Sequence, residues 1–213
     1  WLAHFAAEED TRVVSLDREK IKQIKAILAE GRTMLPADRN MDKPIVFMIV
    51  GVPNVGKSTL INALANRSIA KTGNIPAITQ RQQRIPIGKN MALLDTPGIL
   101  WPRISPAECG YRLAFTGAIL DNQFDFEELS YFAASFLAER YPESLQHRYK
   151  LKDVPIDSTE VLHAIAAKRG CLGKGGVPNM NRVAEILIRE FRQGKLGRIT
   201  MERPKDSVRL TTT

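Results

Sequence analysis

One segment of this 213-residue chain has the residue types and spacing to hold a phosphate group. Residues 51–58 read G-V-P-N-V-G-K-S. Glycines let a backbone curl so that successive N–H groups point inward at an anion. Lys57 would reach the outer phosphates of a nucleoside triphosphate, and the Ser58 hydroxyl would ligate magnesium. The segment thus has the pattern of a P-loop; the alternative is a glycine-rich turn that only connects two elements.

The flanking residues predict the elements that such a loop needs. Residues 45–50 are an uninterrupted apolar run, which is typical of a buried strand. Residues 59–66, T-L-I-N-A-L-A-N, predict a helix. A helix that starts near Lys57 would point its positive dipole end at the phosphates. Strand, loop and helix in this order are the context that the motif requires.

A second segment, D-T-P-G at 95–98, follows the apolar run 91–94. In P-loop enzymes an aspartate at such a strand end holds magnesium through water, and the N–H of a following glycine meets the γ-phosphate. Alone, D-T-P-G is a turn sequence, but at a strand end 38 residues after Lys57 it predicts the second half of the site. Thr79 lies between the two motifs, where a switch threonine would close on magnesium; the alternative is a solvent-exposed loop residue.

Composition excludes several classes of protein. With 44% hydrophobic and 25% charged residues, the chain is ordinary for a globular protein. No apolar run approaches the roughly 20 residues of a membrane span. The two cysteines form neither a disulfide framework nor a zinc pattern, so a reducing compartment is expected. Residues 1–10 lack the features of a signal peptide.

The net charge of +8 is unevenly placed. Residues 106–162 carry 5 Lys and Arg against 10 Asp and Glu, whereas residues 163–203 carry 9 against 3. The basic block is a candidate surface for a polyanion such as RNA. A solvated surface without a partner is the competing interpretation.

The first half of the chain predicts strands alternating with helices, and hence a parallel-rich α/β sheet. Besides the P-loop unit we expect a short strand at 12–15, a helix at 17–29 with Asp17 as N-cap, and paired strands at 84–87 and 91–95.

The second half predicts helices. Apolar stripes at helical spacing occur in 126–137, in 161–166 with Ser158 or Thr159 as N-cap, and in 183–191. We expect these stripes to be core. The predicted organisation is a nucleotide-binding domain, a linker, a helical domain and a tail, at residues 1–104, 105–124, 125–203 and 204–213.

Several segments together carry a resemblance to a known family. They are GVPNVGKSTLIN at 51–62, KTGNIPAITQRQQ at 71–83, LLDTPGILWP at 93–102, LAFTGAI at 113–119, RYKLKD at 148–153, AAKRGCL and GKGG within 166–176, and RVAEILIREFRQGKLGRIT at 182–200. With them the chain resembles the ribosome biogenesis GTPase A (YlqF) family of circularly permuted GTPases.

The resemblance implies a fold. We expect an α/β P-loop NTPase sheet with flanking helices, circularly permuted and N-terminally incomplete, followed by a small all-α domain. The guanine-reading N-K-x-D, which the family carries upstream of the P-loop, does not occur in this sequence. Residues 13–16, V-V-S-L, resemble the loop that touches the base, which makes Ser15 a candidate contact.

The resemblance also implies ligands and their residues. We expect GTP or GDP and Mg²⁺, with Ser58, Thr79 and Asp95 toward the magnesium, and K⁺ as a further ion at Asn54. No catalytic residue is assigned, because apolar Ile99 and Leu100 stand where many GTPases carry the glutamine that orients water. Thr79 and Gly98 would support catalysis. The expected nucleotide contacts are Ser15, Asn54, Val55, Gly56, Lys57, Ser58, Thr59, Thr79, Asp95 and Gly98.

The implied function is a GTPase that assists assembly of the large ribosomal subunit, in the bacterial cytoplasm or an organelle. The helical domain would contact rRNA, with phosphate-binding candidates Lys168, Arg169, Lys174, Lys195 and Arg198. Two alternatives stay open. One is a nucleotide-gated RNA-binding module with little hydrolysis, and the other is an ATPase of unrelated role, which D-T-P-G disfavours.

Overall fold

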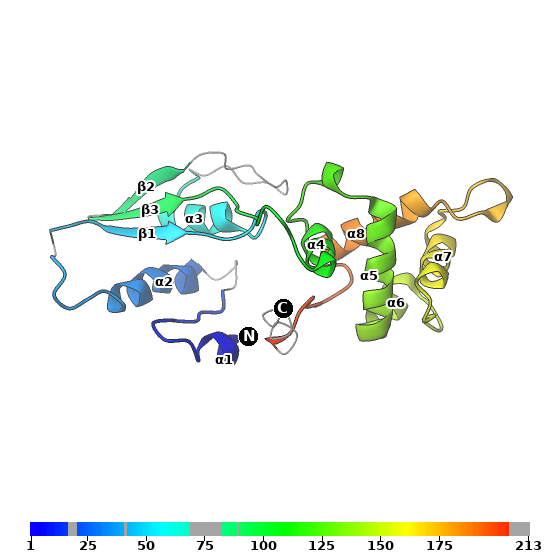
Figure 1. The fold of residues 1–213 in the computed structure, drawn as a ribbon, viewed down its shortest axis with the longest axis horizontal. Coiled ribbons are helices and arrows are strands. Elements are labelled where there is room, and N and C mark those ends of the chain that lie inside the picture. Colours follow the sequence, from blue (N-terminus) through cyan, green and yellow to red (C-terminus); the bar gives the residue numbers. More distant parts are fainter. Residues whose placement is uncertain (17–20, 41, 69–81, 89, 205–213) are drawn as a thin grey trace. The chain divides into compact units, whose positions relative to one another are not determined.

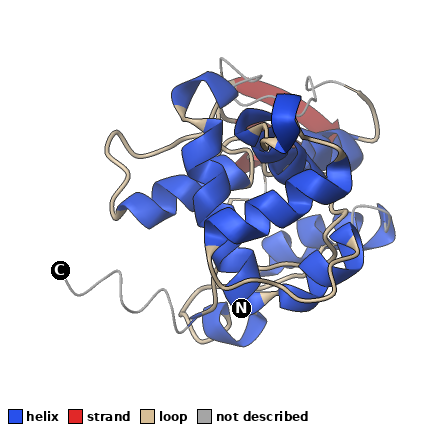
Figure 2. Cartoon of the chain, turned by 90° about the vertical axis from the view of Figure 1, so that its right-hand side faces the viewer, coloured by secondary structure: helices blue, strands red, loops and turns tan. Residues whose placement is uncertain are grey.

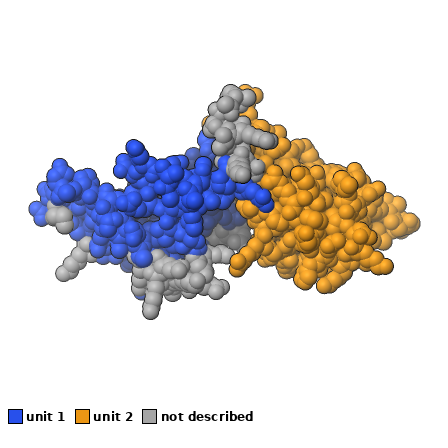
Figure 3. Space-filling view, turned by 90° about the horizontal axis from the view of Figure 1, so that it is seen from below, with its two compact units in different colours: residues 1–101, 202–213 blue, residues 102–201 orange. Residues whose placement is uncertain are grey.

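The computed structural model describes residues 1–16, 21–40, 42–68, 82–88 and 90–204. The chain divides into two compact units, which Figure 3 colours separately. Unit 1 comprises residues 1–101 and 202–213, and unit 2 comprises residues 102–201. Helices predominate among the described residues (Figure 2). None of these helices is long and apolar enough to cross a lipid bilayer.

Unit 1 contains a small mixed sheet (Figure 1). Its elements are α1 (Leu2–Phe5), α2 (Ile21–Thr33), β1 (Ile45–Ile49), α3 (Lys57–Ala65), β2 (Gln83–Gly88) and β3 (Met91–Asp95). The strand order is β1-β3-β2, with β1 parallel to β3 and β2 antiparallel to β3. The described sheet is therefore less parallel than expected, because only two residues separate β2 from β3 and so short a connection permits only antiparallel pairing.

The core of unit 1 joins both longer helices to one face of the sheet. Its buried side chains are Ile24 from α2, Ile61 and Leu64 from α3, Ile85 from β2 and Leu93 from β3. On β1, Phe47 and Ile49 pack against this cluster, as the period of two in a strand requires. The alternate residues Val46 and Met48 are 45% and 58% exposed, so the described residues leave the other face of β1 uncovered.

Two N-terminal elements differ from the expectation. Residues 12–15 form no strand, and Val14 is 43% exposed, so this run lacks the burial that stabilises a strand. Helix α2 runs on to Thr33 through Gly31, where a Cβ would meet a Phe47 ring carbon at 2.5 Å. The absent side chain thus lets the helix approach the sheet. The proposed N-cap Asp17 lies outside the described residues.

Unit 2 is helical, as predicted. Its elements are α4 (Ala107–Phe115), η1 (Asp121–Gln123), α5 (Phe126–Arg140), α6 (Pro142–Tyr149), α7 (Ser158–Arg169), η2 (Lys174–Gly176) and α8 (Met180–Arg192). Helix α5 packs against α4, α6, α7 and α8 (Figure 1). The three predicted stripes supply core residues, among them Leu129, Leu137, Ile165 and Leu187, each at most 1% exposed.

The N-cap of α7 is Asp157 rather than Ser158 or Thr159. Its carboxylate accepts hydrogen bonds from the N–H groups of Thr159 at 2.9 Å and Glu160 at 3.0 Å. A charged acceptor satisfies two of the unpaired N–H donors of the first turn, and its negative charge interacts favourably with the positive end of the helix dipole. The helix therefore begins one residue before the earlier of the two expected starts.

Candidate nucleotide-binding site

The P-loop connects β1 to α3, as the sequence predicts. Its Gly56 is the N-cap of α3 and has φ of 94°, a left-handed conformation that favours glycine. Asn54 also has a left-handed φ, of 57°, which asparagine tolerates better than most residues. Helix α3 starts at Lys57, as expected for a helix whose dipole points at the phosphates, so Lys57, Ser58 and Thr59 form its first turn. Asn54, Val55 and Thr59 are exposed.

Lys57 folds back over its own loop. Its Nζ donates to the carbonyl oxygens of Gly51 at 3.1 Å and Val52 at 2.9 Å. Burial lowers the pKa of this ammonium, and the negative charge of Asp95 partly opposes that effect. The loop therefore holds a partly desolvated cation close to a carboxylate from the second motif.

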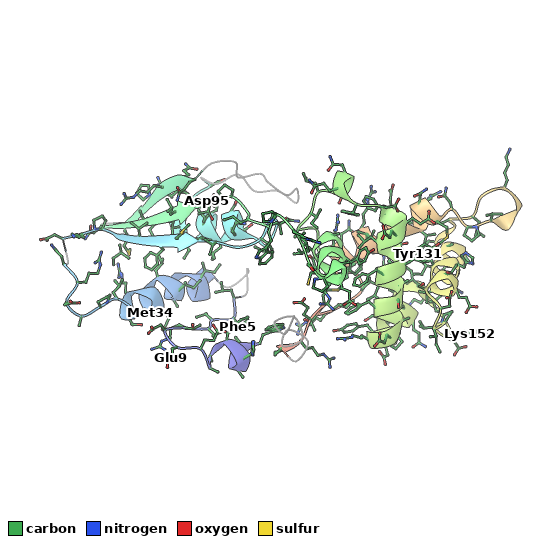
Figure 4. All side chains as sticks on the ribbon, in the orientation of Figure 1. Phe5, Glu9, Met34, Asp95, Tyr131 and Lys152 are labelled. Atoms are coloured by element: carbon green, nitrogen blue, oxygen red, sulfur yellow. The ribbon has the colours of Figure 1, made fainter. Side chains whose placement is uncertain are left out.

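Asp95 ends β3 (Figure 4). Its side chain is buried, with 2% of the residue exposed. The strand register pairs it with Ile49, the last residue of β1, so the D-T-P-G segment starts beside the start of the P-loop. The hydroxyl of Thr96 donates to the Ile49 carbonyl at 2.7 Å and joins the two strand ends. Ligands of α/β sheets bind at such carboxyl ends of strands.

Gly98 lies directly on the P-loop. A Cβ at Gly98 would stand 2.6 Å from Pro53 Cα and 2.7 Å from Pro53 N, which no side chain could occupy without a backbone shift. The next residue, Ile99, donates its N–H to the Gly51 carbonyl at 3.3 Å. The two motifs are therefore in backbone contact, and Gly98 is a glycine because Pro53 approaches so closely.

Neither Pro53 nor Thr96 was picked out from the sequence. Pro53 is buried beneath Gly98, and Thr96 is 4% exposed. Both lie inside the recognised motifs, but the sequence of one loop cannot show which residues pack against another loop. The side chain of Ile99 is 63% exposed and has no polar atom with which to orient a water molecule.

One expected nucleotide contact is not joined to this cluster, and another lies outside the described residues. Ser15 lies exposed in the segment that follows α1. Thr79 lies outside the described residues. The structure thus places Gly98 against the P-loop and Asp95 close to Lys57. The assignment of each of these residues to the nucleotide stays a prediction.

The RNA-binding candidates of unit 2 differ in their surroundings. Lys168, Lys174, Lys195 and Arg198 are exposed. Arg169 instead forms an ion pair with Glu190 at 2.9 Å and lies over the Tyr149 ring, 5.0 Å from its centroid. This arginine therefore contributes to the packing of unit 2.

Glu190 links three helices. It also pairs with Arg148 of α6 at 2.6 Å. Burial alone would raise the pKa of Glu190, but hydrogen bonds from Arg148 and the charge of Arg169 bring it below its ordinary value. Burial, followed by the charge of Glu190, raises the pKa of Tyr149. The carboxylate is thus held ionised at the junction of α6, α7 and α8.

Comparison with known proteins agrees with this geometry. The family described as 50S ribosome-binding GTPase matches residues 46–129. Ribosome biogenesis GTPase A of Bacillus pumilus is 44% identical over 211 residues, covering 96% of this chain and 75% of that protein. The protein of the same name in Priestia megaterium is 41% identical over 215 residues, covering 97% of this chain and 74% of that protein.

This chain belongs to the ribosome biogenesis GTPase A family. It is accordingly a P-loop GTPase, an enzyme that hydrolyses GTP. A GDP-bound YlqF structure aligns with a TM-score of 0.64 at 27% identity, covering 97% of this chain and 76% of that one. A GNP-bound YlqF from T. maritima aligns with a TM-score of 0.60 at 25% identity, covering 97% and 75%. The family resemblance is confirmed, and so is the expected fold class of a P-loop GTPase sheet with flanking helices followed by a helical part.

Proposed function

We propose that this GTPase assists assembly of the large ribosomal subunit, and that its GTP state controls binding to rRNA or to a precursor of the subunit. The observation that carries the proposal is the contact of Gly98 with Pro53, because it couples the segment that would sense the γ-phosphate to the loop that would hold it. Ribosome assembly in bacteria would place the protein in the cytoplasm, associated with ribosomal particles.

Phosphate binding would fall to the P-loop backbone and Lys57. In the structure the Lys57 ammonium is bonded to two loop carbonyls. Phosphate oxygens are stronger acceptors for a cation than carbonyls are, so the ammonium would exchange these bonds for the β- and γ-phosphates. The positive end of α3 would favour the same anion.

Metal binding would use oxygen ligands from both motifs. Ser58 in the first turn of α3 and Asp95 at the end of β3 supply a hydroxyl and a carboxylate, the hard donors that Mg²⁺ prefers. When bound, Mg²⁺ supplies positive charge that stabilises the charge developing on the phosphates. We assign Thr79 to the same ion, the Asn54 amide oxygen to K⁺ and Ser15 to the guanine base.

Hydrolysis by this chain alone should be slow. Ile99 cannot polarise or orient the attacking water, since its side chain is apolar. Activation by a partner is worth up to about 10⁵-fold in GTPases. We therefore expect the ribosomal particle to stimulate hydrolysis, after which loss of the γ-phosphate contact at Gly98 would favour release.

Contact with rRNA would fall to the basic residues of unit 2. Lys168, Lys174, Lys195 and Arg198 are exposed and can reach phosphates, which dominate affinity for RNA. We assign Arg169 to the same surface as well, since its side chain is 29% exposed despite its ion pair with Glu190.

The test is the affinity for purified large-subunit particles in the presence of a non-hydrolysable GTP analogue or of GDP. We expect binding at least about tenfold tighter with the GTP analogue. Equal affinity in both states would rule out control by the nucleotide.

The exposed Ile99 also favours a second candidate, an RNA-binding module that nucleotide gates but barely hydrolyses. Single-turnover hydrolysis with large subunits separates the two, measured on this chain and on a version extended upstream. Stimulated turnover supports the GTPase cycle, whereas GTP-dependent binding without turnover in either version supports the gated module.

A further inference from the structure

The segment between α7 and α8 is an exposed loop whose two ends are joined by backbone hydrogen bonds. Residues 172–177 are all exposed, and we call residues 172–178 the GKGG loop after its central residues. Leu172 and Pro178 form an isolated β-bridge, and the Gly173 N–H donates to the Val177 carbonyl at 2.7 Å. Below them, the N–H of Asn179 donates to the carbonyl of buried Cys171 at 2.8 Å. The loop is thus held in one shape while its tip faces solvent.

The glycines of this loop leave its backbone open. Gly175 and Gly176 have φ of 74° and 77°, which explains why glycine is favoured there. Gly173 has φ of −88°, which any residue adopts, and a Cβ there would meet only the Val177 oxygen, at an ordinary 3.5 Å. Neither the backbone nor the packing of this chain requires glycine at 173. Glycine at 173 leaves this stretch of backbone open to close approach by a partner molecule.

Every Asp, Glu, Lys or Arg position in the sequence around the GKGG loop is a Lys or Arg. Residues 161–184 contain no Asp or Glu, and they include Lys168, Arg169, Lys174 and Arg182. Arg169 is paired with Glu190, whereas Lys168, Lys174 and Arg182 are exposed. Within the part of the chain that the structure describes, these three side chains have no ion pair. An anion at the loop would therefore meet several cations and no acidic side chain from this stretch.

The loop also presents apolar surface beside this charge. Leu172 is 47% exposed and Val177 is 66% exposed, one on each arm. Apolar side chains next to a cation and an open backbone match a ligand that alternates charged phosphates with flat bases. A G-x-x-G loop between helices holds the backbone of four nucleotides in the KH class of RNA-binding domains, which shows that such a loop can perform this task.

We propose that the GKGG loop grips the sugar–phosphate backbone of a single-stranded RNA segment. The backbone at Gly173 lies against the RNA, Lys174 pairs with a phosphate, and Leu172 and Val177 contact unstacked bases. This inference rests on the proposed binding of rRNA and assigns it a place and a strand type. Single strands fit better than a duplex, since a duplex keeps its bases stacked away from apolar side chains.

The experiment measures binding of the full chain to a fluorescent 12-nucleotide single-stranded RNA, and to a duplex of the same sequence, over a series of salt concentrations. Gly173→Ala adds one methyl group at a conformation that alanine adopts, so the fold should persist while RNA affinity falls by about three- to tenfold. Gly173→Asp adds negative charge and should weaken binding by more than about tenfold. Lys174→Gln should reduce the slope of log affinity against log salt by about 0.7, as expected for one phosphate of a single strand.

Lys152→Gln is the matched control, because Lys152 is an exposed lysine of unit 2 away from the GKGG loop (Figure 4). It should leave affinity and salt slope unchanged, and circular dichroism checks the fold of every variant. If the unmodified chain binds no RNA, the rRNA part of the proposed function fails. If it binds RNA and the Gly173 variants bind equally well, the GKGG loop inference alone fails. Tighter binding of the duplex than of the single strand would also overturn the GKGG loop inference. So would Gly173 variants that lose binding to the subunit but keep their affinity for RNA, because that result would indicate a protein partner.

Discussion

Lys57 is the residue on which phosphate binding most directly depends. Its ammonium is desolvated within the P-loop and held by the carbonyl oxygens of Gly51 and Val52. A cation placed this way has lost part of its hydration before any phosphate arrives, so less hydration remains to be removed when a phosphate binds. Burial lowers the pKa of this ammonium, and the negative charge of Asp95 opposes that effect in part.

Lys57→Ala should raise the Kd for GTP by at least about 100-fold, because the only side-chain cation of the loop is lost. Equilibrium titration with a fluorescent GTP analogue measures the change. Lys43→Ala removes an exposed lysine just before β1 and serves as control, with no change expected. Unaltered affinity in the Lys57 variant would contradict the site.

Gly98→Ala should damage the fold around the site. The new Cβ would press on the Pro53 backbone at 2.6 Å, so we expect a loss of about 1–3 kcal/mol in the free energy of unfolding and a reduced preference for GTP over GDP. Urea unfolding and nucleotide titration measure the two effects.

Gly110→Ala is the control for that substitution. Gly110 lies within α4, and the nearest atom to a Cβ there is a methyl of Ile104 at 3.8 Å. Alanine should fit and stabilise the helix by about 0.4–1 kcal/mol. If Gly98→Ala and Gly110→Ala changed the free energy of unfolding alike, the protein could accommodate a Cβ at Gly98 without strain against Pro53.

At the scale of elements, Glu190 holds three helices of unit 2 together. It lies on α8 and pairs with Arg148 at the end of α6 and with Arg169 at the end of α7. Its side chain is 12% exposed and those of the two arginines about 28–29%, so solvent screens the pairs only in part. The basic ends of two helices are thereby neutralised within the unit.

Glu190 should make the free energy of unfolding depend on pH, with stability lost at low pH. Its pKa is lowered in the folded state, so its contribution is complete above the unfolded pKa of about 4.3 and is lost as the pH falls through the folded value. Glu190→Gln should cost about 1–2 kcal/mol at pH 7, and the gap to the unmodified protein should narrow below about pH 4. Urea titrations from pH 3 to pH 7 measure this gap.

Glu185→Gln provides the comparison on the same helix. Glu185 pairs with Arg189 at 3.2 Å, but both side chains are about half exposed or more. Such a pair contributes less than about 0.5 kcal/mol. A gap that stays constant with pH for the Glu190 variant would contradict the proposed role of its charge.

At the scale of the molecule, each unit has a hydrophobic core of its own. The core of unit 1 lies between the sheet, α2 and α3, and that of unit 2 surrounds α5. The nucleotide site lies wholly in unit 1, whereas the GKGG loop and the candidate rRNA contacts lie in unit 2. Binding of nucleotide should therefore stabilise one core directly.

Calorimetry should resolve this division. GTP at about 100 times its Kd should add about 2.7 kcal/mol to the stability of unit 1 and raise only its unfolding transition. The transition of unit 2 should stay in place, and Lys57→Ala should abolish the shift. One transition that moves as a whole would show that the two cores unfold together.

Much of the site was predictable because its parts are local. The P-loop, the D-T-P-G segment and their flanking strands and helix are each specified by a few neighbouring residues, and the structure places them within two residues of expectation. The strand expected at 12–15 failed for the opposite reason: a strand depends on partners elsewhere in the chain, which a short apolar run cannot report.

The amino-acid sequence by itself determined the ligand class, the family and the helical nature of unit 2, because motif spacing and apolar periodicity are properties of short stretches. Only the tertiary structure decided that Gly98 rests on Pro53, that Lys57 lies close to Asp95, and that Arg169 is paired with Glu190. These are contacts between residues that are distant in sequence. Their geometry follows from strand register and helix packing, which no single segment encodes.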